Sequence, residues 1–186
     1  PWAWYVSRAS GLVAFIFLWL TILLGLSIRN PLLKRIIAPI YSFGFHVFTA
    51  GSAVFWVLVH GTSLLFDKFI GFGLKDVALP YFSQSGSVNV NYLALGIMAF
   101  YMMVIMTITS YLKRHLNFWV WRILHFLHPL AFIFVVIHGY SIGTDMKNIW
   151  VAGTFLFSSA FLVLIYLSSL FFVILNRMRK DVSNLK

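Results

Sequence analysis

Four histidines are the residues of this chain best suited to chemistry, because they lie in pairs within two otherwise apolar stretches. His46 and His60 lie 14 positions apart in residues 41–61, and His125 and His138 lie 13 positions apart in residues 121–139. Neutral imidazole donates a nitrogen lone pair to haem iron, and two axial imidazoles give a six-coordinate centre suited to electron transfer. The pattern therefore predicts a four-histidine haem scaffold.

The spacing of each pair indicates two separate haem sites. At the rise of an α-helix the two separations span about 21 Å and about 20 Å. If the two helices run parallel, His46 meets His125 at one depth and His60 meets His138 at another. A single histidine inside a membrane is often a hydrogen-bonding contact between helices, so the interpretation rests on the set of four.

The composition indicates a protein that lives in lipid. Hydrophobic residues make up 61% of the chain, the mean hydropathy is +0.93, and 186 residues include only 14 Lys and Arg and 4 Asp and Glu. These values lie outside the range of soluble domains. The net charge of +10 does not predict nucleic-acid binding, because the basic residues lie between apolar runs and form no continuous stripe. The absence of cysteine excludes thiolate-ligated clusters, disulfides and thiol catalysis within this chain.

Five apolar segments are long enough to span a membrane as helices. They cover about residues 11–28, 36–66, 91–112, 119–142 and 148–175, and a Gly-, Pro- and Ser-rich connection covers residues 67–90. We expect an all-α integral membrane protein, a five-helix transmembrane bundle with two b-type haems between the second and fourth helices. Residues 1–176 would form the haem domain, and residues 177–186 a cytoplasmic basic tail.

The distribution of positive charge predicts the orientation of the bundle. Ten of the 14 basic residues lie in three clusters, which follow the first apolar segment, open the fourth and follow the fifth. The positive-inside rule assigns these clusters to the cytoplasm: Arg29, Lys34, Arg35, Lys113, Arg114, Arg122, Arg177, Arg179, Lys180 and Lys186. The N-terminus is then outside and the C-terminus cytoplasmic, in a bacterial inner membrane or a plasma membrane. The second and fourth helices run in the same direction. His46 and His125 therefore bind the inner haem iron, and His60 and His138 the outer.

The fourth helix cannot be regular if both of its histidines face the second helix. A separation of 14 residues returns to within about 40° of the starting direction, whereas 13 residues miss it by about 140°. Pro129 lies between His125 and His138, so we expect a break or kink there. His128 is a rival inner ligand, but its distance to His138 would be only about 15 Å. Its role stays open between an interhelical contact and proton or substrate chemistry.

Arg122 precedes His125 by one turn of the same helix. Its guanidinium could pair with a propionate of the inner haem. It could also serve only as a cytoplasmic anchor, and the two roles are compatible.

Several short motifs resemble the ferric reductase-like transmembrane domain superfamily. They are WRxLH (Trp121, Arg122 and His125), HG (His138 and Gly139) and GTD at residues 143–145. The superfamily includes NADPH oxidases, eukaryotic ferric reductases and the bacterial haem-binding membrane partner of periplasmic methionine sulfoxide reductase. The resemblance implies b-type haem between two helices and electron transfer from a cytosolic flavin or membrane donor to an acceptor on the opposite side. The four-histidine pattern is similar to the two-haem branch.

We therefore expect a dihaem b-type electron-transfer protein that serves as the membrane subunit of an oxidoreductase. The chain carries no flavin or nicotinamide domain, so FAD or FMN would lie on a flavoprotein or other redox partner, or a quinone would supply electrons. Lipid is the other expected partner. Alternatives are a stand-alone ferric or oxygen reductase at the outer haem edge and a quinol-linked haem subunit. A proton or metal transporter is disfavoured, because the histidines of the second helix lie about 21 Å apart.

Overall fold

The computed structural model describes residues 2–28, 30–36, 39–83, 86 and 88–183, and these residues form helices and no strand. Short 3₁₀ turns lie at Leu33–Arg35 (η1), Lys113–His115 (η2) and Thr144–Lys147 (η3). The α-helices are α1 (Trp2–Ser27), α2 (Pro39–Leu64), α3 (Leu74–Ala78), α4 (Val90–Tyr111), α5 (Phe118–His125), α6 (His128–Ile142) and α7 (Ile149–Ser183).

Five segments of the described chain are long and apolar enough to cross a membrane, as expected. They are Trp2–Ser27, Tyr41–Leu64, Val90–Tyr111, Phe118–Ile142 and Ile149–Arg179. The expected boundaries are wrong in three places. The first helix begins at Trp2, the connection at residues 67–90 contains the short helix α3, and the last helix continues to Ser183. The described part of the expected basic tail is therefore helical, whereas residues 184–186 lie outside the described residues.

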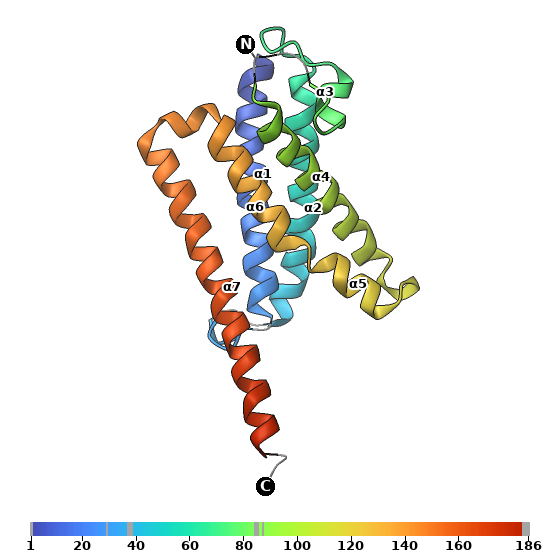
Figure 1. Cartoon of the computed structure of the whole chain (residues 1–186), viewed down its shortest axis with the longest axis vertical. Helices are drawn as coiled ribbons and strands as arrows, with labels where there is room; N and C mark the ends of the chain where they lie inside the picture. Colours follow the sequence, from blue (N-terminus) through green and yellow to red (C-terminus); the bar gives the residue numbers. More distant parts are fainter. Residues whose placement is uncertain (1, 29, 37–38, 84–85, 87, 184–186) are drawn as a thin grey trace.

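The helices surround a central antiparallel pair, α1 and α2, which pack along each other (Figure 1). Helix α4 packs along α6, and α7 contacts α1 and the η3 turn. Helix α5 leaves the line of α6 at an angle, and α7 extends past the other helices towards the C-terminus (Figure 1). The arrangement places α2 opposite the α5–α6 segment, where the paired histidines are expected.

The two ends of the bundle differ in charge. The connections from α1 to α2 and from α4 to α5 lie at the same end as the C-terminus, and the N-terminus and α3 lie at the other (Figure 1). The exposed basic residues at the C-terminal end include Lys34, Arg35, Lys113, Arg114, Arg177 and Arg179. The three basic clusters thus share one end, although Arg29 and Lys186 lie outside the described residues. That this end faces the cytoplasm remains a prediction.

The core of the bundle is apolar, and many large apolar side chains also face outward, as expected where lipid is the solvent. A buried polar contact lies near the C-terminal end. Asn30 is only 1% exposed, and its amide nitrogen donates to the hydroxyls of Ser168 at 3.1 Å and Ser169 at 2.8 Å. Its amide oxygen accepts from the backbone nitrogen of Leu32 at 2.9 Å. Asn30 therefore joins the α1–α2 connection to α7.

We predict that Asn30→Ala lowers the free energy of unfolding by about 1–3 kcal/mol, because a buried donor–acceptor group is lost and the Leu32 N–H loses its partner. Thermal unfolding in detergent micelles measures the effect. Ser169→Ala is the matched control, since it removes only one of these hydrogen bonds and should cost less. Equal losses from the two substitutions would contradict the role of Asn30.

Candidate haem-binding site

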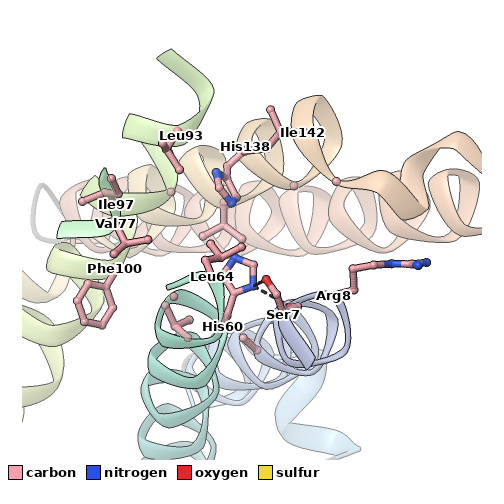
Figure 2. A pocket seen from close by; sticks show the side chains of 18 of the residues that line it. Ser7, Arg8, His60, Leu64, Val77, Leu93, Ile97, Phe100, His138 and Ile142 are labelled. Carbon is pink, nitrogen blue, oxygen red and sulfur yellow. Dashed lines mark hydrogen bonds between the residues drawn. The ribbon is translucent and has the colours of Figure 1, made fainter. Parts of the chain in front are cut away.

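The structure brings the four histidines together as two facing pairs. Helix α2 supplies His46 and His60, α5 supplies His125, and α6 supplies His138. The ring centres of His46 and His125 lie 6.2 Å apart, and those of His60 and His138 lie 6.3 Å apart. Figure 2 shows the second pair facing across a cavity. The pairing is the one expected from helix direction and spacing.

These separations fit one metal ion between each pair of rings. With bonds of about 2 Å and about 1.1 Å from each nitrogen to its ring centre, a bis-imidazole metal centre separates the ring centres by about 6.2 Å. Each pair supplies two ligands. Among the described residues, no group of three or more His, Cys, Asp or Glu side chains converges. The donor set therefore suits a metal whose other coordination positions are filled by a macrocycle.

A helix break explains how a 13-residue separation can face one partner helix. Helix α5 ends at His125 and α6 begins at His128, so Phe126 and Leu127 lie outside both helices. Pro129 occupies the first turn of α6. The expected break at Pro129 is confirmed. It changes the direction of the chain between the two histidines, and both rings face α2.

His128 stabilises this break. In a regular helix the carbonyl of His125 would accept from the backbone nitrogen of residue 129, but proline has no N–H. Nδ1 of His128 donates to that carbonyl at 3.0 Å instead. The ring centre of His128 lies 5.8 Å from that of Tyr166 on α7. His128 therefore has a structural contact that sequence analysis left open.

Nδ1 of three of the paired histidines donates a hydrogen bond to a backbone carbonyl of a supporting helix. The distances are 2.8 Å from His46 to Thr21, 2.8 Å from His60 to Ser7 and 2.9 Å from His138 to Tyr92. A carbonyl oxygen can only accept, so Nδ1 must carry the proton. Each Nε2 then keeps its lone pair for a metal, which is the usual way in which a second contact orients a histidine ligand.

Glycines leave the space that these three rings occupy. A Cβ atom at Gly11 would lie 3.0 Å from Nδ1 of His60, and one at Gly25 would lie 3.2 Å from Cε1 of His46. A Cβ atom at Gly96 would overlap three ring atoms of His138. Sequence analysis missed Gly11 and Gly25. Their separation of 14 residues equals that of His46 and His60, and this was the available signal.

A cavity of about 390 Å³ surrounds the His60–His138 pair, a volume typical of cofactor sites. Its lining is mostly apolar, and Figure 2 labels six of these residues: Leu64, Val77, Leu93, Ile97, Phe100 and Ile142. An apolar cavity with two facing imidazoles fits a flat, largely hydrophobic macrocycle such as haem.

Arg8 and Asp145 also line the cavity and form an ion pair. Nε of Arg8 donates to the Asp145 carboxylate at 3.0 Å, and a second guanidinium nitrogen contacts the other carboxylate oxygen. The hydrogen bond from Arg8 holds the pKa of the Asp145 carboxyl below its usual value, although burial opposes this shift. The pair joins α1 to the η3 turn between α6 and α7.

Arg122 and His115 are the remaining candidates. The guanidinium carbon of Arg122 lies 5.5–5.9 Å from the centres of three nearby aromatic rings, those of Phe118, Trp119 and Phe126. His115 lies in the connection after α4, where it accepts from Arg114 at 2.9 Å. The contact of Arg122 with a haem propionate remains a prediction.

The fold is that of a multi-pass integral membrane protein with two facing pairs of histidines. The profile of the family described as ferric reductase like transmembrane component matches residues 10–137, more than half of the chain. The chain therefore belongs to this family, which suggests a membrane redox role and whose members generally bind haem. No curated protein and no solved structure matches the chain.

We predict that Gly96→Ala lowers the haem content of the purified protein, because the added methyl group displaces the His138 ring. A pyridine haemochrome assay per polypeptide measures it. Gly51→Ala is the matched control, since a Cβ atom at Gly51 has no neighbour within 4 Å. Equal haem contents in the two variants would show that the ring does not need this space.

The Arg8–Asp145 pair predicts a pH-dependent contribution to stability. Asp145→Asn should reduce stability slightly at neutral pH, as expected for a partly exposed ion pair. Because the folded-state pKa of Asp145 is lowered, the contribution is complete above the unfolded-state pKa of about 3.9 and disappears as the pH falls through the folded-state pKa. Unfolding of both proteins at pH 7 and pH 3 tests this. A difference that persists unchanged at pH 3 would contradict it.

Proposed function

We propose that this chain is a dihaem b-type transmembrane electron-transfer protein. His46 and His125 hold one haem, and His60 and His138 hold the other. The observation that carries the proposal is the repetition of one geometry at two depths, with ring centres 6.2 Å and 6.3 Å apart. The two pairs are separated by 14 residues of α2, about 21 Å along its axis.

The residues of the chain bind and orient the cofactors. A haem iron bound by two imidazoles supplies a one-electron carrier without an open coordination position. The Nδ1–H groups of His46, His60 and His138 are used by backbone carbonyls, so their Nε2 atoms are available as ligands. The cavity around His60 and His138 is lined mainly by apolar residues, which would give the macrocycle an apolar environment.

The charge of the two ends supports a direction for electron transfer. We place the basic C-terminal end in the cytoplasm, which makes His46 and His125 the inner pair. The donor is then a flavoprotein or another redox partner at this end, with any FAD or FMN on that partner, or a membrane quinol. Arg122 lies one turn before His125 and would contact an inner haem propionate. The acceptor lies on the opposite side.

The first experiment is a count of b-type haem per polypeptide, with spectra before and after reduction. We expect two haems in the wild-type protein and one in His60→Ala or His138→Ala, because each substitution removes one ligand of a separate site. In these variants the inner haem should still be reduced by the donor side, while electron transfer to an external acceptor stops.

His115→Ala is the matched control, because His115 lies in an exposed connection and contacts Arg114. It should keep both haems. A wild-type protein without haem would overturn the proposal. The loss of both haems from His60→Ala, with the fold retained, would show that the two sites are not separate.

A further inference from the structure

The supporting helix α4 repeats its contact with the α5–α6 segment, with one change of chemistry. Gly96 lies against His138, and the carbonyl of Tyr92, four residues earlier, accepts from the Nδ1 of that histidine. Fourteen residues after Gly96 stands Ser110. Its hydroxyl oxygen lies 3.4 Å from Nδ1 of His125. A side-chain hydroxyl thus contacts Nδ1 of His125. Nδ1 of His60 likewise lies 3.2 Å from the hydroxyl of Ser7, in addition to its contact with the Ser7 carbonyl.

The hydroxyl of Ser110 has one proton and two lone pairs, and its three contacts can use all of them. The shortest contact, 2.7 Å, is to the carbonyl of Met106, which can only accept, so the hydroxyl proton lies there. Nε1 of Trp121 can only donate, and it lies 3.4 Å from the same oxygen. The remaining lone pair accepts from Nδ1 of His125. This set of contacts favours the tautomer of His125 that keeps the lone pair on Nε2.

Trp121 also packs against the face of the His125 ring. The two rings are stacked, with centres 5.2 Å apart and an interplanar angle of 22°. The ammonium group of Lys113 lies 4.1 Å from the centre of the Trp121 ring. His125 is therefore oriented by a hydroxyl from α4 and by an aromatic ring one turn earlier on α5.

We propose that Ser110 is a positioning residue that sets the reduction potential of the haem bound by His46 and His125. This inference rests on the proposed dihaem function. A hydrogen bond accepted from Nδ1–H makes an imidazole a stronger electron donor to its metal and favours the oxidised iron. The Ser110 oxygen is shared between His125 and Trp121, so a change at either neighbour alters the donor strength of His125.

The test is a redox titration of the two haems in purified protein, followed by absorbance and by electron paramagnetic resonance of the ferric state. In Ser110→Ala the Nδ1–H loses the Ser110 hydroxyl as an acceptor, so the midpoint potential of one haem should shift to a more positive value. The other haem should be unchanged. Ser110→Thr keeps the hydroxyl and should restore the wild-type potential.

Trp121→Phe provides a second test, in which the midpoint potential of the same haem should shift in the opposite direction. It keeps an aromatic ring against His125 but removes the Nε1–H, so the Ser110 oxygen accepts from His125 alone. The same haem should shift to a more negative potential. This variant also keeps the proposal falsifiable if Ser110→Ala fails to fold.

Thr109→Val is the matched control, because the Thr109 hydroxyl donates to the carbonyl of Ile105 on its own helix at 2.6 Å. It should leave both potentials unchanged. Two bound haems with wild-type potentials in Ser110→Ala, or an equal shift of both haems, would overturn the role of Ser110 while the proposed function stands. A wild-type protein without haem would overturn both.

Discussion

The arrangement of the paired histidines depends on one constraint: an imidazole keeps its Nε2 lone pair when its proton is on Nδ1, and this N–H needs a hydrogen-bond acceptor inside an apolar bundle. For His46, His60 and His138 the acceptors are backbone carbonyls of neighbouring helices, which have a spare lone pair. An imidazole reaches such a carbonyl only where the residue of the neighbouring helix beside the ring has no bulky side chain. The residue four positions after the carbonyl is glycine in three cases: Gly11 after Ser7, Gly25 after Thr21 and Gly96 after Tyr92. The close packing of α1 on α2 and of α4 on α6 follows from this requirement.

Each pair of contacts must also lie on one face of its helix, and this explains why α1 and α2 are regular whereas the α5–α6 segment is broken. A spacing of 14 residues almost returns to the same face of a helix, so α1 and α2 can meet at two depths without distortion. The histidines of the α5–α6 segment are 13 residues apart and need a change of direction. Proline supplies it by removing a backbone donor, and the Nδ1 of His128 bonds the carbonyl that is left. A third histidine in this segment thus maintains the break that lets His125 and His138 face α2.

Much of this arrangement could be predicted from the sequence, because hydropathy and histidine spacing are strong signals in a membrane protein. The five spans, the pairing of His46 with His125 and of His60 with His138, and the break near Pro129 all followed from these signals. The acceptors of Nδ1 did not, since a backbone carbonyl leaves no mark in the sequence. The continuation of α7 to Ser183 was also missed, because Arg177 and Arg179 end the apolar run without ending the helix.

The two ends of the bundle offer different electrostatic environments to the two pairs of histidines. At the N-terminal end the charge of Arg8 is balanced by Asp145 within the cavity wall. At the C-terminal end the exposed cations Lys34, Arg35 and Arg114 lie in the described chain without an acidic residue in the same connections. Such an excess attracts an acidic surface and raises its encounter rate, and it also fits a cytoplasmic location. The proposed cytoplasmic orientation and the proposed donor side near His46 and His125 therefore rest on the same charge distribution.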